Sequence, residues 1–142
     1  MASKTPSKIR IRPVKPRDLA AVVELIAPYM DEGKLLPRTT EELEDLLPHG
    51  FVAVAGRRIV GCAALEIYSP KLAEIRSLAV ALDHQGQGIG KQLVEACVHR
   101  AQEKNVLEVM AITSSEQFFK HCGFNFTLPG EKKALFIQTR DL

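Results

Sequence analysis

A glycine-rich run from Asp83 to Lys91 constrains the fold of this chain more than any other feature. The run reads DHQGQGIGK, and it lies between an apolar, strand-like segment at 74–80 and an amphipathic segment at 89–102. Glycines accept positive φ angles, and the start of a helix leaves N–H groups free at the positive end of its dipole. A strand, a glycine turn and a helix start therefore predict a pocket for a phosphorylated cofactor.

The spacing of the glycines excludes two common phosphate-binding motifs. A dinucleotide fingerprint needs G-x-G-x-x-G in the first βα unit, whereas Gly86, Gly88 and Gly90 give G-x-G-x-G after roughly the fourth predicted strand. A P-loop needs G-x-x-x-x-G-K-[ST], but Gln85 stands at the first glycine position and Gln92 at the hydroxyl position. The pattern that remains is Q-x-x-G-x-G directly after a strand.

That pattern resembles the pyrophosphate-binding motif of the GCN5-related N-acetyltransferases, which bind acetyl-CoA. Four more segments are similar to that family in the same order: IRIRP at 9–13, IVGCAAL at 59–65, EIRSLAV at 74–80 and FFKHCGF at 118–124. Within the family, LPRT at 36–39, CAAL at 62–65, AEIR at 73–76 and FF at 118–119 resemble the acetyltransferase domain of N-acetylglutamate synthases. Those enzymes often carry an amino-acid-kinase domain, so the resemblance implies a short, stand-alone version.

Composition bounds the classes of protein that need to be considered. With 142 residues, 46% of them hydrophobic, we expect one acetyltransferase domain at 8–142 behind a flexible tail at 1–7. No run approaches the ~20 apolar residues of a membrane span. A net charge of +2 and 6% aromatic residues give no nucleic-acid-binding stripe. Three cysteines favour a reducing compartment, and no Cys/His spacing matches a metal site. We therefore expect a cytoplasmic protein without nucleic-acid, membrane or metal partners.

Hydrophobic periodicity predicts a single α/β domain. Alternation predicts a strand at 8–13. Apolar segments between turn residues predict strands at 51–55, 59–68, 74–80 and 106–112, and short final strands at 124–126 and 134–138. Helical spacing and capping residues predict helices that begin at Pro16, after Thr39, at Ile89 and after Ser114 or Ser115. This order predicts a mixed, mostly antiparallel sheet of about seven strands with helices on both faces.

The resemblance implies a direct attack of an amine on a thioester. A general base helps because the amine arrives mostly protonated, and Glu74 stands where the family often places a glutamate. On a regular strand Glu74, Arg76, Leu78 and Val80 share one face, so Glu74 would face the acceptor. The alternative is a surface carboxylate paired with Arg76. The resemblance also implies a backbone N–H near Val80 as the oxyanion donor, where two parallel strands splay apart.

The residue at the usual position of the general acid differs from the commonest pattern of the family. Many members have a tyrosine in the late helix, where this chain has Phe119. Thr113, Ser114 or Ser115 could place a hydroxyl or a water near the sulfur, and Ser115 is the candidate catalytic hydroxyl. Helix capping is the alternative role of the serines. A thiol pKa of about 8.5 also makes thiolate a tolerable leaving group without any acid.

The resemblance further implies which residues bind the cofactor and the acceptor. The cofactor would contact the strand end, the glycine loop and the late helix through Leu78, Ala79, Val80, Gln85, Gly86, Gln87, Gly88, Ile89, Gly90, Lys91, Phe118 and Phe119. Arginine matches a carboxylate with two parallel hydrogen bonds, so Arg38, Arg76 and, more weakly, Lys34 are candidates for holding an acidic acceptor. An ordinary glycine turn and solvated surface charges are the alternatives.

The acceptor that this resemblance favours is L-glutamate, which would be acetylated at its α-amine. Another small-molecule or protein amine is one alternative, and a non-catalytic acyl-CoA-binding module is another, since the late-helix tyrosine is missing. Cys62, Cys97 and Cys122 are interpreted as small buried hydrophobic residues rather than acyl-cysteine nucleophiles. Many relatives pair as dimers, so a homodimer is one arrangement that the resemblance implies.

Overall fold

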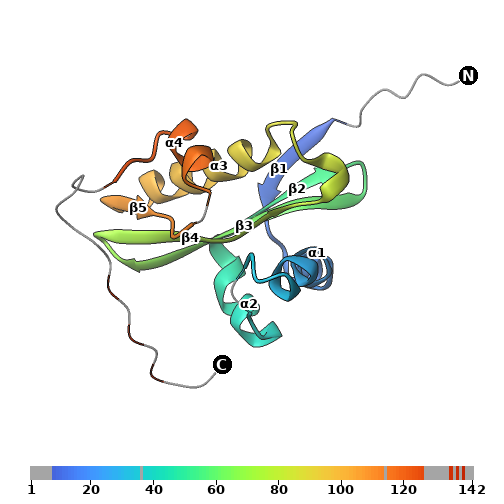
Figure 1. Ribbon diagram of the computed structural model, residues 1–142, viewed down its shortest axis with the longest axis horizontal. Coiled ribbons are helices and arrows are strands. Elements are labelled where there is room, and N and C mark those ends of the chain that lie inside the picture. The colour runs from blue at the N-terminus through green and yellow to red at the C-terminus, as the bar shows by residue number, and fades with distance from the viewer. Residues whose placement is uncertain are drawn as a thin grey trace, which may run out of the picture. The chain divides into compact units, whose positions relative to one another are not determined.

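A five-stranded sheet forms the centre of the fold (Figure 1). The computed structural model describes residues 8–35, 37–113 and 115–126 and the single positions 135, 137 and 139. The chain divides into two units, residues 1–112 and 113–142. The sheet and the helices on both of its faces belong to the first unit, and the helix α4 (Glu116–His121) belongs to the second.

The strands lie in the sheet in the same order as in the chain. They are β1 (Ile9–Pro13), β2 (Phe51–Ala55), β3 (Arg58–Ser69), β4 (Leu72–Val80) and β5 (Glu108–Met110). The first four pair antiparallel, whereas β5 pairs parallel to β4. A parallel pair needs a crossover connection, and helix α3 (Ile89–Glu103) provides it. The predicted mixed, mostly antiparallel sheet with flanking helices is confirmed.

The predicted number of about seven strands is wrong, because the described residues form five. Residues 124–126 adopt no regular structure. They follow Gly123, whose φ of 92° ends helix α4, and the Phe124 N–H is committed to the Phe119 carbonyl at 3.0 Å. That bond caps the helix instead of starting a strand ladder. The other predicted strand, 134–138, lies largely outside the described residues.

Helices α1 (Leu19–Asp31) and α2 (Thr40–Leu46) cover one face of the sheet, and α3 covers the other (Figure 1). The core under α1 and α2 is formed by Val22, Ile26, Leu43, Leu47, Val52, Val54, Cys62 and Ala79. On the other face, Gly61 of β3 lets α3 approach closely. A Cβ at Gly61 would lie 3.0 Å from Leu93 Cδ1 and 3.3 Å from Ile89 Cγ2. The apolar stripe of α3 thus packs directly on the centre of the sheet.

A capping box fixes the start of α2, as the sequence predicts. The Glu42 N–H donates to Thr39 Oγ1 at 3.1 Å, and the Thr39 N–H donates to Glu42 Oε1 at 3.3 Å. The Arg38 N–H donates to the Met30 sulfur at 3.4 Å, which ties the connection back to α1. The backbone that carries Arg38 is therefore held from both sides.

Strand β4 contains a bulge that simple alternation does not predict. Cys62 of β3 pairs with Ala79, whereas Ala64 pairs with Arg76, so the register shifts around Ser77. Ser77 has a φ of 53°, in the left-handed region that few residues other than glycine adopt. The Cys62 thiol donates to the Ser77 carbonyl at 3.3 Å. Such a bulge bends a strand locally and redirects the side chains beyond it.

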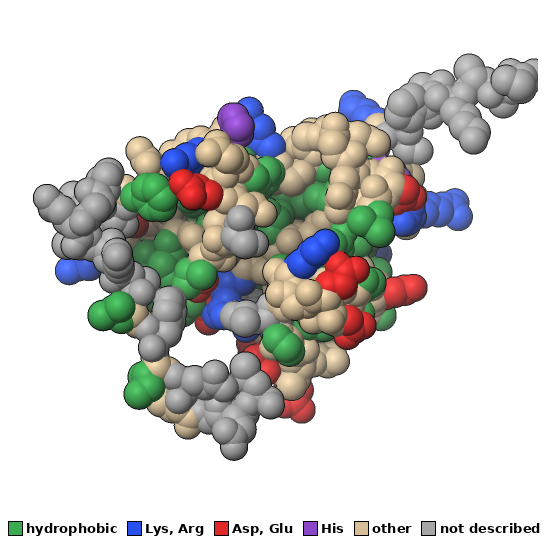
Figure 2. Space-filling view, in the orientation of Figure 1, with side chains coloured by type: hydrophobic (Ala, Val, Ile, Leu, Met, Phe, Trp, Pro, Cys, Tyr) green, Lys and Arg blue, Asp and Glu red, His purple; other side chains and the backbone are tan. Residues whose placement is uncertain are grey.

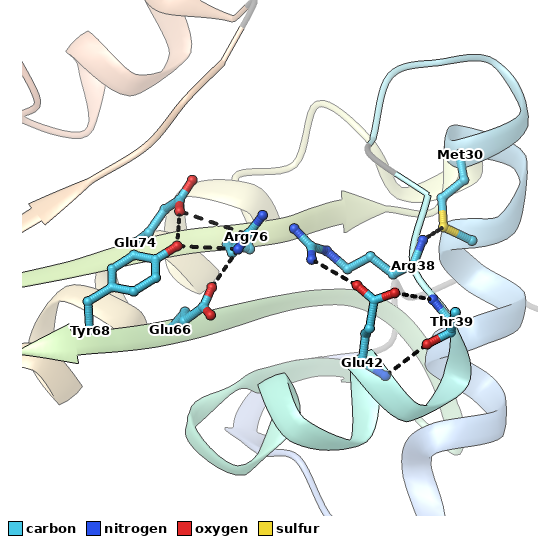
Figure 3. A network of polar contacts seen from close by, with 8 residues as sticks. All are labelled: Met30, Arg38, Thr39, Glu42, Glu66, Tyr68, Glu74 and Arg76. Carbon is cyan, nitrogen blue, oxygen red and sulfur yellow. Dashed lines mark hydrogen bonds and ion pairs between the residues drawn. The ribbon is translucent and has the colours of Figure 1, made fainter. Parts of the chain in front are cut away.

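The bulge reverses the alternation of faces along β4. Paired residues of an antiparallel ladder point to the same face, and Val80 pairs with Gly61, which packs against α3. Arg76 lies on the other face, opposite Arg38 of the α1–α2 connection (Figure 3). The prediction that Val80 shares a face with Glu74 and Arg76 is therefore wrong, because an inserted residue shifts every later side chain to the opposite side.

Candidate active site

The glycine-rich loop joins the end of β4 to the start of α3. After a short 3₁₀ turn, η3 (Leu82–His84), Gly86 and Gly88 adopt φ angles of 78° and 79°. Among the residues that the structure describes, no neighbouring atom lies within 4 Å of the position that a Cβ would take at either glycine. These glycines are therefore required by their backbone conformation, and the space beside them is open to a ligand.

Free backbone donors surround that open space. Among the described residues, no acceptor is found for the N–H groups of residues 86 to 91, whereas the Gln92 N–H donates to the Gly88 carbonyl at 3.1 Å. Gly88 is the N-cap of α3, so these N–H groups lie at the positive end of a 15-residue helix. Lys91 adds an exposed cation in the first turn. The loop has the donors and the charge to hold an anion.

Gln85 and Tyr29 anchor this loop. The Gln85 side-chain amide donates to Tyr29 Oη at 2.9 Å and to the Val80 carbonyl at 3.2 Å. The Tyr29 hydroxyl also donates to the Val80 carbonyl. The Gln85 N–H is directed to the Leu82 carbonyl at 3.4 Å, so this N–H is not among the free donors. Gln85 and Tyr29 of α1 together hold the loop against the end of β4.

Strands β4 and β5 separate beside the loop. Their parallel pairing covers three positions and ends at Glu74 and Met110, while β4 continues to Val80. The Ala81 N–H donates to the Val60 carbonyl at 2.8 Å. Successive N–H groups of a strand point to opposite edges, so the Val80 N–H points away from β3 and toward the edge that β5 has left. This N–H can therefore donate to a group bound between the two strands.

Glu74 lies at the point where the two strands separate. Its side chain is buried, with 8% of its surface exposed. The Tyr68 hydroxyl donates to Glu74 Oε1 at 2.5 Å, and Arg76 Nε lies 3.8 Å from the same oxygen. Glu74 is therefore not a solvated surface carboxylate, although it is paired with Arg76.

A polar network extends from Glu74 across β3 and β4 (Figure 3). Glu66 lies directly opposite Glu74 in the register, and Arg76 Nη1 donates to Glu66 Oε2 at 2.5 Å. Burial is the largest single influence on Glu66 and opposes its ionisation, but hydrogen bonds from Arg76 and Tyr68 and the nearby arginine charges together outweigh it and lower the pKa of that carboxyl. Partial burial and hydrogen bonds with Glu74 and Glu66 raise the pKa of the Tyr68 hydroxyl. Tyr68 is thus a hydrogen-bond donor at neutral pH.

Arg38 extends toward this network from the connection before α2 (Figure 3). Its side chain is 10% exposed, and Glu42 Oε2 lies 3.7 Å from Arg38 Nη1. Burial and the nearby charge of Arg76 lower the pKa of Arg38, although a guanidinium remains charged at neutral pH. Two cations facing each other in a partly buried place suit an anionic ligand. Lys34, by contrast, is 66% exposed and pairs with Glu32 at 3.1 Å.

The second unit holds the remaining predicted residues. Ser115 is the N-cap of α4, but its side chain makes no capping hydrogen bond, and its N–H donates to Thr113 Oγ1 at 2.8 Å. Phe119 is buried and packs edge-on against Phe118 and Phe124, with ring centroids 5.1 and 5.2 Å away. Ser114 lies outside the described residues. The hydroxyl of Ser115 is therefore not used as the helix cap.

The buried cysteines are not nucleophiles. Burial raises the pKa of both Cys62 and Cys97 to about 12. A thiolate is the reactive form, and such a pKa leaves almost none of it at neutral pH. The interpretation of these two residues as small hydrophobic core residues agrees with their complete burial.

The surface carries charges of both signs. Figure 2 shows Lys and Arg side chains interspersed with Asp and Glu side chains over the face that it draws. Within the described ranges, no group of three or more His, Cys, Asp or Glu side chains is placed to hold a metal ion. In the same part of the chain, no helix has the length and apolar character that crossing a membrane requires.

Sequence reasoning did not assign three residues of this site: Tyr29, Glu66 and Tyr68. The sequence contains a signal for two of them, Glu66 and Tyr68. Glu66 and Tyr68 alternate on one strand, and the Ser69-Pro70 turn places that strand beside Glu74. The hydrogen bonds of Tyr29 and Gln85 to Val80 depend on tertiary packing between α1 and the sheet, for which the sequence carries no local signal.

The fold carries a glycine loop with free backbone N–H groups, and a buried carboxylate on the strand that leads into it, features that suit acyl transfer from a phosphorylated carrier. The chain belongs to the acetyltransferase (GNAT) family, whose profile matches residues 19–124. It is 36% identical to an N-acetyltransferase of Chlorobaculum tepidum, CT2212, over 80% of this chain and 74% of that protein. The chain is therefore an N-acetyltransferase, as the resemblance implied.

Another relative is an amino-acid acetyltransferase of Haemophilus ducreyi, which is 32% identical over 75% of this chain. The chain spans only 25% of the length of that protein, and 28% to 31% of two further amino-acid acetyltransferases. These matches cover one part of longer proteins.

Two solved structures share the fold. Rv2747 of Mycobacterium tuberculosis, in complex with CoA and NLQ, has a TM-score of 0.78 at 26% identity, over 88% of this chain and 76% of that one. The N-acetylglutamate synthase of Neisseria gonorrhoeae, complexed with coenzyme A and N-acetyl-glutamate, has a TM-score of 0.75 at 25% identity, over 82% of this chain and 28% of that one.

Proposed function

We propose that this acetyltransferase transfers the acetyl group of acetyl-CoA to the α-amine of L-glutamate. The observation that carries the choice of acceptor is the approach of Arg38 to Arg76 beside the buried carboxylate of Glu74. A base next to two cations suits a substrate that carries both an amine and carboxylates. The similarity to an N-acetylglutamate synthase bound to N-acetyl-glutamate supports the same choice.

The donor is acetyl-CoA, which supplies an activated acyl thioester. We assign its diphosphate to the N–H groups of Gly86, Gln87, Gly88, Ile89, Gly90 and Lys91. The fit rests on the free donors and on the open space beside Gly86 and Gly88. The pantetheine arm is assigned to the unpaired edge of β4 at Leu78, Ala79 and Val80, and contacts from Phe118 and Phe119 stay a prediction.

Glu74 is the proposed general base. It would take a proton from the acceptor ammonium, directly or through one water, because a protonated amine has no lone pair for attack. The Tyr68 hydroxyl holds one oxygen of Glu74 in place and leaves the other for the substrate. The Val80 N–H would donate a hydrogen bond to the charge that develops on the carbonyl oxygen.

The departing thiolate needs no strong acid in this scheme. Tyr68 is poorly suited to protonate it, since its pKa is raised rather than lowered. A thiol pKa of about 8.5 makes thiolate a tolerable leaving group at neutral pH. The hydroxyl of Ser115 stays a candidate for a hydrogen bond to the sulfur. A homodimer and a cytoplasmic location also remain proposals.

Arg38→Gln tests the acceptor. We expect KM for L-glutamate to rise roughly 10- to 100-fold with little change in the affinity for acetyl-CoA, because one charged hydrogen bond contributes about 1.5–3 kcal/mol. The preference for glutamate over glutamine should shrink with it, since the side-chain carboxylate loses its partner. A panel of amines assayed by thiol release gives both quantities.

Lys34→Gln is the matched control, because it removes one cation from the same connection at an exposed position. We expect KM for glutamate to stay within about twofold in this variant. Equal effects of the two substitutions would exclude Arg38 as the group that holds the acceptor, and thiol release from other amines but none from glutamate would exclude glutamate as the acceptor.

A further inference from the structure

A cavity of about 500 Å³ lies between β1, the start of α1 and the turn that joins β2 to β3. Cationic side chains from three separate segments line it, namely Arg10, Arg12, Lys15, Arg17 and Arg57. Asp18 is the carboxylate among its lining residues. None of these residues has a role in the acetyl-transfer site.

Asp18 is fully engaged by Arg12. Arg12 Nη1 lies 2.7 Å from Asp18 Oδ2, and Nη2 lies 3.0 Å from Oδ1, so the pair is bidentate. The Lys15 N–H also donates to Asp18 Oδ2 at 2.7 Å. Asp18 is 4% exposed, and the charge of Arg17 adds to the effect of Arg12 in lowering the pKa of its carboxyl. The charge of Asp18 is therefore balanced within this pair.

The other four cations are not balanced. In the part of the chain that the structure describes, Arg10, Lys15, Arg17 and Arg57 form no ion pair. Four cations without an ion pair gather in one cavity, whereas the net charge of the whole chain is +2. Like charges gathered in one place repel each other, and a bound anion would remove that repulsion.

The cavity also has the form of a ligand site. Val54 and Ile59 of the sheet and Ala21 of α1 give it apolar surface between the cations. Its volume falls within the range of roughly 300–1,000 Å³ that is typical of small-molecule sites. Arg10, Lys15, Arg17 and Arg57 are all exposed to solvent, so an anion would be held by several charged contacts together rather than by burial.

We propose that this cavity binds a small polyanion, a molecule that carries several phosphate or carboxylate groups, at a site separate from the glycine loop. Four cations match a ligand with at least three negative charges better than a single phosphate. Guanidinium groups also recognise the oxyanions of both kinds of ligand with paired hydrogen bonds. Tripolyphosphate represents ligands with several phosphate groups, and citrate represents ligands with several carboxylate groups.

Calorimetry on the full chain tests the proposal. Tripolyphosphate and citrate are titrated in the presence of saturating coenzyme A, so that the glycine loop is already filled. We expect at least one of them to bind with one-to-one stoichiometry. The variant Arg10→Gln/Arg57→Gln should weaken that binding roughly tenfold or more while the affinity for coenzyme A stays unchanged. Raised salt should weaken it further.

The matched control is Lys71→Gln/Lys104→Gln, which removes two exposed cations elsewhere. We expect this variant to bind the polyanion within about twofold of the unmodified chain. Binding of tripolyphosphate or of citrate identifies the ligand class, and either outcome supports the site. The proposal is overturned if neither probe binds once coenzyme A is present, or if both double variants weaken binding equally.

Discussion

Glu74→Gln is expected to lower kcat by about two to three orders of magnitude at neutral pH, while the affinity for acetyl-CoA stays within about twofold. Glutamine keeps the size of the side chain and can still accept the hydrogen bond from Tyr68, but it cannot take a proton. The loss should shrink as the pH rises, because more of the acceptor then arrives deprotonated. Steady-state rates across a pH series and calorimetry with acetyl-CoA measure both quantities.

Glu66→Gln is the matched control, since it removes the same charge from the position directly opposite Glu74. Glu66 holds Arg76 through a hydrogen bond of 2.5 Å, so the expected effect falls on KM for the acceptor rather than on kcat. Tyr68→Phe should lower kcat by roughly tenfold, because Glu74 stays present but loses its orienting partner. If Glu74→Gln has no larger effect on kcat than Glu66→Gln, Glu74 is not the base.

Gly86→Ala/Gly88→Ala is expected to weaken the binding of coenzyme A by roughly 100-fold. A Cβ at these positions meets no neighbouring atom of the described residues, so the effect arises from two other sources. The methyl groups occupy the space assigned to the diphosphate, and the left-handed φ angles become unfavourable by about 1–2 kcal/mol per residue. Calorimetric titration with coenzyme A gives the affinity, and urea unfolding gives the stability of the same variant.

Gly56→Ala separates the effect of blocked ligand space from the effect of an unfavourable φ angle. Gly56 lies in the turn between β2 and β3 with a φ of 61°, and no neighbouring atom in the described part of the chain lies within 4 Å of its Cβ position. The substitution should therefore destabilise the fold by a similar amount per residue while the affinity for coenzyme A is unchanged. A comparable loss of affinity in Gly56→Ala would show that stability, and not the glycine loop, controls binding.

Local signals predicted most of the fold. The capping box of Thr39 and Glu42, the continuous apolar run at 51–55 and the periodic face of α3 each depend on neighbours in the sequence, and the structure has all of them. The errors arose where tertiary contacts decide. The bulge at Ser77 depends on the register with β3 and on the bond from Cys62, and alternation along one strand carries no record of either.

The residues of the site also divide into those that local sequence signals predict and those that tertiary contacts decide. The glycine loop was predictable because backbone chemistry demands glycine at Gly86 and Gly88. The burial of Glu74 and the approach of Arg38 to Arg76 were not, since both require segments far apart in the sequence to meet. A candidate arginine could be named from its chemistry, but its partner could be assigned only from the structure.

The amide resonances of Gly86, Gly88 and Gly90 provide the most direct test of the central claim, that coenzyme A is held by backbone N–H groups of the glycine loop. The full chain labelled with ¹⁵N is titrated with coenzyme A and followed by NMR. We predict that these three N–H signals change most, because hydrogen bonds to phosphate form at their own atoms. Saturable binding that leaves all three signals in place while others move would contradict the account.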